Sequence, residues 1–362
     1  MKNEIGSFYE KTYIETKEYC KEGTFSANLL LNSGREAIGY VINNIEHFSS
    51  NLKKVCVLPM YTCDTVVIPF QQRGWKIYYY NIHKDLSINK QEFLTLMHDV
   101  EPEVLLVHTY YGVDTIKSVR GEIARMQKEK GLIFIEDLTQ SLGFYGEIEG
   151  ADYYVGSLRK WFPITDGGFV STEKKLYIHP KDQKNEFVKL KKHAQQMKYL
   201  YLNDDDSIDK ADFLAMNRKA EDLLYKDNRI CKMSDYSIKI LKTIDTKEFF
   251  EIRSKNGLYL YKNICQMHHV CPVLNEKNAS YLYYPIYTDN RNRLQEYLTK
   301  QDIYAPVLWP ICKDIERHLD ADTQFVYDHL LALPCDQRYS IKDMKRIIDC
   351  LREYDDLMER DE

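Results

Sequence analysis

The chain has 362 residues, more than one hydrophobic core usually holds, so two domains, or one large domain with an appendage, are expected. Its 50 lysines and arginines against 55 aspartates and glutamates give a net charge of −5, mixed along the sequence. This balance provides no broad basic surface for nucleic acid, so small molecules and other protein chains are the expected partners.

The nine cysteines show neither a C-x-x-C motif nor the Cys/His spacing of a metal site, which fits a reducing compartment better than a disulfide framework. Three consecutive aspartates at 204–206 indicate a solvated loop, since no glycine-turned calcium loop surrounds them. Residues 1–6 lack the apolar core of a signal peptide, and no apolar run approaches membrane-spanning length. We therefore expect a soluble, cytoplasmic protein with no metal site and no membrane partner.

The first half of the chain alternates short β-rich runs with helical stretches. Strands are expected at 27–31, Val55–Pro59, 76–82, 104–109, Ile133–Asp137, 153–156 and Gly168–Ser171, and helices at 34–48, 61–72, 89–100 and 115–130. Strands that alternate with helices in this way predict βαβ units, and hence a mainly parallel sheet covered by helices on both faces.

The composition changes after Thr172. A helical insertion is expected at about 173–230, and a long linking helix at 247–267. Short runs at 280–287 and 303–308 then alternate with helices at Arg291–Lys300 and 341–354, which is an α+β pattern. We predict a large α/β domain over residues 1–245 and a smaller α+β domain over residues 246–362.

A candidate site follows the strand Ile133–Asp137, because open α/β sheets place their ligands at the carboxyl ends of the strands. Asp137 ends this strand, Gln140 follows it, and Lys160 lies a little further along the chain. A carboxylate that can keep a ring nitrogen protonated and a lysine that can condense with an aldehyde together indicate pyridoxal phosphate chemistry. Taken singly, Asp137 could cap a turn, Gln140 could satisfy backbone groups, and an average lysine is simply solvated.

Two further stretches fit this chemistry. Ser33 is a plausible N-cap, and Gly34 has no Cβ to keep a ligand away from the free N–H groups at the helix start, where a phosphate can bind. An ordinary capped helix is the alternative reading of this turn. For Lys160, the apolar neighbours Trp161 and Phe162 predict a partly buried side chain whose pKa is lowered.

Several stretches, in this order, also carry a family resemblance. They are Asn32-Ser33-Gly34-Arg35-Glu36-Ala37, Pro59-Met60-Tyr61-Thr62-Cys63, Val107-His108-Thr109-Tyr110-Tyr111-Gly112, Glu136-Asp137-Leu138-Thr139-Gln140-Ser141-Leu142-Gly143, the pair Ser157 and Lys160, and Asp166-Gly167-Gly168. The sequence resembles the DegT/DnrJ/EryC1/StrS family of pyridoxal-phosphate-dependent sugar aminotransferases, closely over residues 25–172 and more loosely up to the last helix. The resemblance implies the fold type I architecture, with a large α/β domain and a smaller C-terminal α+β domain.

The resemblance also implies roles for individual residues. Lys160 would form the internal aldimine with pyridoxal 5'-phosphate and later move the proton, Asp137 would pair with the pyridinium nitrogen, and Gln140 would lie beside the phenolic oxygen of the ring. Ser157 and the turn Ser33-Gly34-Arg35 would hold the phosphate. The implied reaction moves an amino group from an amino acid, glutamate in our reading, to a keto sugar linked to a nucleotide. A homodimer with a shared active site is implied, with residues 180–235 nearest the partner's site.

The chain departs from the family pattern around its lysine. Arg159 stands where the family commonly has threonine, and the spacing from Ser157 to Lys160 is shorter than in the family. Arg159 or Arg35 could therefore act as a charged clamp for the phosphate.

A second departure concerns the residue that stacks on the ring. Cys63 stands where an aromatic residue commonly lies, and Tyr61 is predicted to take its place. His108 ends a buried strand, so the sequence leaves open whether it belongs to the core or to the site.

Two alternative functions remain open. Related dehydratases act on deoxysugars with the same fold, but they replace the lysine with histidine, so Lys160 speaks against dehydration here. A catalytically inactive cofactor-binding or scaffold relative is the other alternative, raised by Arg159 and Cys63.

Overall fold

A computed structural model describes residues 3–12, 25–204, 207–274, 279–312, 315 and 319–361 of the chain. Of the aspartates predicted to form a solvated loop, Asp205 and Asp206 lie outside the described residues. Along the described parts of the chain, none of the helices combines the length and apolarity needed to cross a bilayer. No cluster of metal-ligating side chains is found among the same residues.

The first half forms a seven-stranded sheet with the order β2-β8-β7-β6-β5-β3-β4. Its strands are β2 Leu29–Leu31, β3 Val55–Pro59, β4 Lys76–Tyr80, β5 Val104–His108, β6 Ile133–Asp137, β7 Tyr153–Ser157 and β8 Gly168–Ser171. β8 pairs antiparallel with both of its neighbours, and the other pairs are parallel. The predicted α/β class with a mainly parallel sheet is therefore confirmed.

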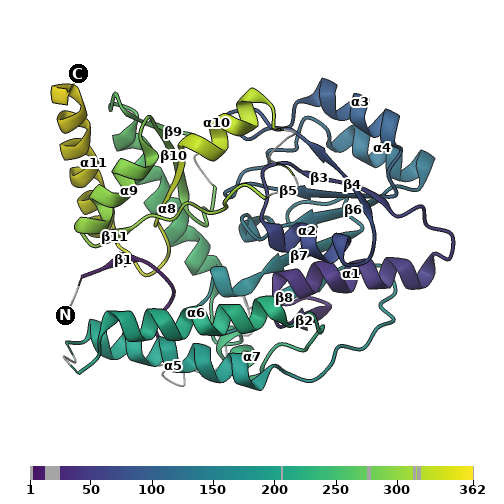
Figure 1. Cartoon of the computed structure of the whole chain (residues 1–362), viewed down its shortest axis with the longest axis horizontal. Helices are drawn as coiled ribbons and strands as arrows, with labels where there is room; N and C mark the ends of the chain where they lie inside the picture. The colour runs from purple at the N-terminus through teal and green to yellow at the C-terminus, as the bar shows by residue number, and fades with distance from the viewer. Residues whose placement is uncertain are drawn as a thin grey trace.

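Helices cover both faces of this sheet (Figure 1). They are α1 Gly34–Phe48, α2 Asp64–Gln71, α3 Lys90–Val100 and α4 Arg120–Lys130. Successive side chains of a strand point to opposite faces, so Val57 packs in the cluster that contains residues of α3 and α4, while Leu58 packs with α1 and α2. Burial on both faces explains why these strands are continuously apolar in sequence.

Two predicted helices start too early. α2 begins at Asp64 rather than at residue 61, because the backbone of its N-cap Cys63 is extended, with φ −87° and ψ 143°. α4 begins at Arg120 rather than at residue 115, because the preceding residues form turns in which Val119 N donates to the carbonyl of Ile116.

The last part of the chain forms a smaller unit around an antiparallel sheet with the order β12-β10-β9. Its elements are α8 Thr246–Ile264, β9 Val270–Pro272, β10 Tyr284–Thr288, α9 Arg291–Lys300, β11 Ile303–Tyr304, α10 Ala321–His329, β12 Leu330–Leu333 and α11 Ile341–Asp361. Residues of this unit share an apolar cluster with the α3 and α4 face of the large sheet, so one continuous core joins the two parts. The division at residues 245 and 246 stays a prediction.

Two segments cross between these parts. The strand β1 Ile5–Gly6 pairs with β11, so the start of the described chain lies against the smaller unit (Figure 1). Within the predicted helical insertion, α5 Asn185–Leu202 and α6 Lys210–Lys226 pack against each other as a helical hairpin, followed by α7 Asp235–Leu241. Both segments contribute side chains to the hollows described next.

Candidate active site

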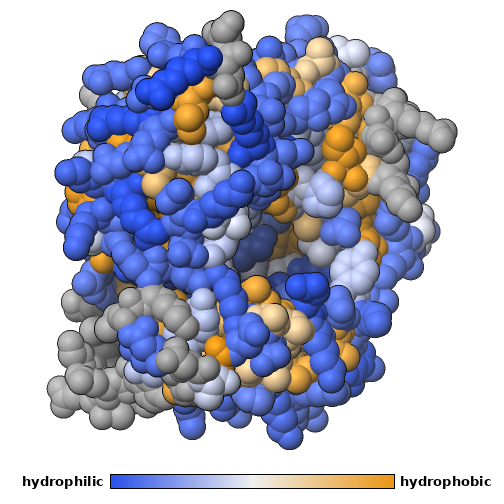
Figure 2. Space-filling model, turned by 60° about the vertical axis from the view of Figure 1, so that its left-hand side comes forward, coloured by the Kyte–Doolittle hydropathy of each residue, from blue (hydrophilic) through white to orange (hydrophobic). Residues whose placement is uncertain are grey.

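Two neighbouring hollows lie where the large sheet, the hairpin and the smaller unit meet. The smaller has a volume of about 240 Å³ and the larger about 480 Å³, and both are lined by Arg159, Lys160 and Glu221. Figure 2 shows one face of the molecule with a hollow near its centre, bordered on several sides by hydrophilic residues. Most of the predicted site residues line the smaller hollow, namely Ser33, Gly34, Arg35, Asp137, Gln140, Ser157 and Lys160.

Strand geometry brings these residues together. β5 ends at His108, β6 at Asp137 and β7 at Ser157, and these three neighbouring strands are parallel. Their carboxyl ends therefore meet at one edge of the sheet, which is where open α/β sheets bind ligands.

Asp137 is a buried carboxylate with two protein partners. Its Oδ1 accepts a hydrogen bond from Thr139 N at 2.8 Å, and its Oδ2 lies 3.4 Å from His108 Nδ1. Burial lowers the pKa of His108, with Asp137 opposing and Lys160 adding to the effect, so the neutral imidazole is favoured. His108 Nε2 lies 2.7 Å from Thr62 Oγ1. A neutral ring with its proton on Nδ1 turns that N–H towards Asp137 and accepts a hydrogen bond from Thr62, so His108 belongs to the site and lies against the carboxylate.

Lys160 ends a short 3-10 turn, Leu158–Lys160, and projects into the hollows. The predicted partial burial is wrong: the side chain is exposed, although Trp161 and Phe162 are fully buried. Protein nevertheless surrounds the hollow, and the resulting loss of hydration lowers the pKa of Lys160; Cys63 opposes this and Arg159 adds to it. No described residue forms a hydrogen bond or ion pair with the Lys160 ammonium, so its nitrogen is available to a ligand.

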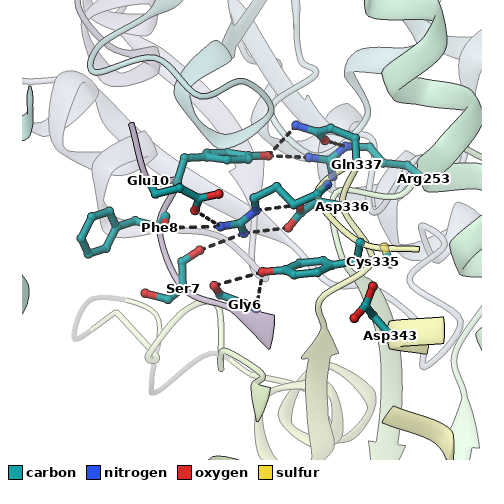
Figure 3. Close-up of polar contacts among 12 residues, drawn as sticks. Gly6, Ser7, Phe8, Glu10, Arg253, Cys335, Asp336, Gln337 and Asp343 are labelled. Atoms are coloured by element: carbon teal, nitrogen blue, oxygen red, sulfur yellow. Dashed lines mark hydrogen bonds and ion pairs between the residues drawn. The ribbon is translucent and has the colours of Figure 1, made fainter. Parts of the chain in front are cut away.

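Three side chains donate hydrogen bonds to the backbone just after Lys160. The carbonyl of Trp161 accepts hydrogen bonds from Tyr9 Oη at 2.9 Å, from Gln337 Nε2 at 2.9 Å and from Arg253 Nη2 at 3.4 Å. Figure 3 shows the N-terminal residues, from Gly6 to Glu10, beside the loop that carries Asp336 and Gln337. The chain on which Lys160 sits is thus fixed by segments from both ends of the sequence.

Arg253 is fully buried, and its guanidinium lies over the Trp161 ring at 4.5 Å. It donates to Gln337 Oε1 and to the carbonyls of Tyr281 and Leu282 in addition to the contacts above. Arg253→Met should lower the free energy of unfolding by about 3 kcal/mol, because it strands several buried acceptors. Urea unfolding followed by circular dichroism measures this.

The matched control is Arg352→Met on the exposed side of α11, which should change stability little. Equal losses in the two variants would contradict the role given to Arg253.

The start of α1 forms the expected cradle. Ser33 is the N-cap, and its Oγ accepts from Glu36 N at 3.3 Å. A Cβ on Gly168 would lie 2.2 Å from the backbone of Ser33, so only glycine fits there, and a Cβ on Gly34 would lie 3.2 Å from the Ser157 Cβ, which is a tight contact. Among the described residues, nothing accepts from the N–H groups of Gly34 or Arg35, so both N–H groups are available to an anion.

Neither arginine suggested as a phosphate clamp is free. The guanidinium of Arg35 donates to the carbonyls of Leu224 and Tyr225 at the end of α6. Arg159 Nη1 pairs with Glu221 Oε1 at 2.7 Å. The cradle therefore consists of hydroxyl and backbone groups, with Ser157 at its edge.

Gln140 is almost fully buried, and only one of its two polar side-chain atoms has a hydrogen-bond partner among the described residues. Its Oε1 accepts from Tyr111 N at 3.1 Å, whereas its Nε2 has no partner among the described residues. A buried amide donor without a partner costs free energy, and an acceptor in the hollow would remove that cost. A ligand oxygen that accepts a hydrogen bond would therefore suit the position in front of Gln140 Nε2.

The aromatic residue that lines the smaller hollow is Trp309, not the predicted Tyr61. Tyr61 is buried and does not line the hollow, but it packs on Trp309, which does, with ring centroids 4.8 Å apart. The Trp309 ring lies at 29° to the His108 ring, with centroids 5.7 Å apart. Sequence reasoning missed Trp309 because it lies in a loop after β11, far along the chain from every motif.

The hairpin supplies two more residues that the sequence did not reveal. Glu221 Oε1 accepts from both Arg159 and Lys191, the latter at 2.8 Å. Burial raises the pKa of Glu221, but Arg159 and Lys191 outweigh it and lower the pKa to about 2. A lysine-rich helical stretch normally indicates a solvated face, so no local pattern distinguishes these residues.

No protein-family model matches the chain, and no curated protein matches it. Solved structures do match. One is PseC of Helicobacter pylori, an aminotransferase involved in the biosynthesis of pseudoaminic acid, at 13% identity and a TM-score of 0.66, covering 98% of this chain and 100% of that chain. A second is a DegT DnrJ EryC1 StrS aminotransferase from Brucella abortus, at 14% identity and a TM-score of 0.62, covering 90% and 85%.

A third is a putative sugar aminotransferase from Streptococcus pneumoniae in its PLP form, at 14% identity and a TM-score of 0.61, covering 92% of this chain and 87% of that chain. Such low identities establish the architecture and leave the activity open. The chain therefore has the fold of the DegT/DnrJ/EryC1/StrS aminotransferases.

Proposed function

We propose that the chain is a pyridoxal-phosphate-dependent aminotransferase of the DegT/DnrJ/EryC1/StrS family that transfers an amino group from glutamate to a keto sugar carried by a nucleotide. The observation that carries this proposal is the convergence of Asp137, the free amide of Gln140, Lys160 and the start of α1 on one hollow of about 240 Å³. The fold, shared with aminotransferases of known structure, supports it.

The residues present fit pyridoxal phosphate at each of its polar ends. The unpaired Nε2 of Gln140 offers a donor to the phenolic oxygen, and the free N–H groups of Gly34 and Arg35 offer donors to the phosphate. Asp137 offers a buried carboxylate to the ring nitrogen. When bound, the cofactor supplies an electron sink for the pair left behind when a proton leaves the substrate carbon.

The chain's own groups perform the remaining tasks. Asp137 would keep the proton on the ring nitrogen, and the buried His108, with its Nδ1 3.4 Å from the carboxylate, would limit the movement of Asp137. Lys160 would hold the cofactor at its aldehyde carbon, and its amine, once released, would be the group that moves the proton between the substrate carbon and the cofactor carbon. A lowered pKa favours this role because more of the amine is unprotonated near neutral pH. Trp309 lines one side of the hollow and packs on the buried Tyr61, so this part of the wall is apolar.

A homodimer with an active site shared between subunits forms part of the proposal. The family resemblance supports the homodimer, and in this proposal residues 180–235 reach towards the partner's site. Size-exclusion chromatography with light scattering tests it directly.

The donor half of the reaction can be tested without knowing the sugar. Protein loaded with pyridoxal phosphate should convert L-glutamate to 2-oxoglutarate once per cofactor and then stop, because no acceptor regenerates the starting form. Mass spectrometry of the quenched mixture counts the product. A protein that retains the cofactor yet forms no 2-oxoglutarate from any amino acid would contradict the aminotransferase proposal.

A further inference from the structure

Glu36 places a buried carboxylate directly behind the proposed phosphate cradle. It follows Gly34 and Arg35 in the first turn of α1 and is only 3% exposed. Its Oε1 lies 3.2 Å from Ser33 Oγ, and Ser33 lines the smaller hollow. A negative charge so near an anion site opposes the binding of a phosphate. The inference that follows rests on the proposed function, because it concerns the phosphate of the proposed cofactor.

Both oxygens of the Glu36 carboxylate have partners. Oε1 accepts hydrogen bonds from Asn32 Nδ2 at 3.1 Å and from the Ser33 hydroxyl. Oε2 accepts from Cys231 N at 2.7 Å. These neutral donors orient the carboxylate but leave its charge in place. The charged partner is Lys184, whose Nζ lies 3.0 Å from Oε1.

Lys184 is the N-cap residue of α5, and its side chain is as deeply buried as that of Glu36. Its Nζ also donates to the carbonyl of Asp227 at 2.9 Å and lies 3.5 Å from the Asp227 carboxylate. That carboxylate has a closer cation of its own, because Arg229 Nη2 lies 2.7 Å away. The charge of Lys184 is therefore matched mainly to Glu36.

Arg35 is adjacent to Glu36 in sequence but is directed elsewhere. Its guanidinium donates to the carbonyls of Leu224 and Tyr225 at the end of α6. Burial raises the pKa of Glu36, and Lys184 opposes this effect. Without Lys184, an ionised Glu36 would be a buried and unpaired charge beside the cradle.

We propose that Lys184 is a positioning residue for the cofactor phosphate, because its ion pair with Glu36 cancels the negative charge behind the cradle. The free N–H groups at the start of α1 then face a phosphate without an opposing carboxylate charge. The pair also joins the cradle to the start of α5, so the hairpin contributes to the cofactor site through charge as well as through packing.

A comparison of pyridoxal phosphate with pyridoxal tests this, because pyridoxal has the same ring and aldehyde but no phosphate. Equilibrium dialysis of cofactor-free protein, in an alkaline buffer that keeps Glu36 ionised, gives both affinities. Lys184→Met should weaken pyridoxal phosphate binding at least about tenfold, the effect of one unit charge roughly 10 Å away at an effective dielectric constant of about 20. Pyridoxal binding should change less than about twofold. Equal losses for the two compounds would indicate a general loss of structure and overturn the proposal.

Three further variants separate charge from shape. Lys184→Arg keeps the charge and should retain most of the affinity for pyridoxal phosphate. Glu36→Gln added to Lys184→Met should restore the affinity to within about threefold of wild type, because no charge then needs to be cancelled. Glu36→Gln alone should bind pyridoxal phosphate at least as tightly as wild type, and it provides the test where Lys184→Met does not fold. Weaker binding by Glu36→Gln, or no recovery in the double variant, would overturn the proposal.

Lys181→Met is the matched control. It removes the same charge from an exposed position of the same segment and should change the affinity for pyridoxal phosphate less than about twofold. A loss equal to that of Lys184→Met would show that any positive charge in this region has the same effect, and would contradict the specific role of Lys184.

The two proposals fail separately. Formation of 2-oxoglutarate by a protein whose preference for pyridoxal phosphate over pyridoxal does not depend on Lys184 would refute only the positioning role. A preference that depends on Lys184 and Glu36, without 2-oxoglutarate from glutamate, would refute only the aminotransferase reaction.

Discussion

Lys160→Ala protein should lose the glutamate half-reaction by about 10⁴-fold or more, because no other described amine lines the smaller hollow to move the proton. Rapid mixing with glutamate, followed by counting of 2-oxoglutarate, measures the rate. Lys189→Ala removes an exposed lysine from α5 and should leave the rate unchanged. A Lys160→Ala rate within tenfold of wild type would exclude Lys160 as the acid–base group.

The same variant separates chemistry from cofactor binding. The Ser33 cradle, Asp137 and Gln140 remain in it, so it should still bind pyridoxal phosphate, though without the covalent link. Borohydride reduction followed by peptide mass spectrometry should attach the cofactor to Lys160 in the wild-type protein and to no residue of this hollow in the variant. Labelling of a different lysine in the wild-type protein would contradict the assignment.

Asp137→Asn should slow the half-reaction by about 10³-fold with little loss of cofactor affinity. The amide keeps the shape of the side chain and its oxygen can still accept from Thr139 N, but it cannot hold a positive charge on the ring nitrogen. Single-turnover rates and equilibrium dialysis with pyridoxal phosphate measure the two quantities. A rate within a few-fold of wild type would show that Asp137 does not control the ring.

The neighbouring carboxylate provides the matched control. Glu136 precedes Asp137 on β6 but is paired with Arg120 at 2.7 Å, away from the hollow lining. Glu136→Gln should therefore lower stability, by leaving Arg120 with one carboxylate fewer, more than it lowers the rate in folded protein.

Short-range sequence patterns predicted those parts of the structure that depend on neighbouring residues in the chain. The apolar run that ends at Asp137, the Ser33 cap and the βαβ alternation predicted strand β6, the start of α1 and a mainly parallel sheet, and the structure has all three. The carboxyl ends of parallel strands meet at one edge of a sheet, which explains why Ser157 lies near Asp137, but Ser157 itself was indicated only by the family resemblance.

The remaining features of the site depend on contacts between distant segments. Trp309 reaches the smaller hollow from a loop of the smaller unit, and Lys191 reaches the larger hollow because α5 packs on α6. The sequence around Trp309 and Lys191 carries no motif or periodicity that distinguishes these two residues from their neighbours. The exposure of Lys160 was misjudged for a related reason, since the burial of Trp161 and Phe162 says nothing about a side chain that points the other way into a hollow.

The central claim is that this chain uses pyridoxal phosphate, held by Lys160, to take the amino group from glutamate. The visible absorption spectrum of the cofactor-loaded protein, recorded while L-glutamate is added, tests it most directly. The band of lysine-bound cofactor should be present at the start, fall as glutamate is added and return when 2-oxoglutarate is added in excess. No such band after pyridoxal phosphate is supplied, or a band that glutamate and other amino acids leave unchanged, would contradict the account and favour a catalytically inactive relative.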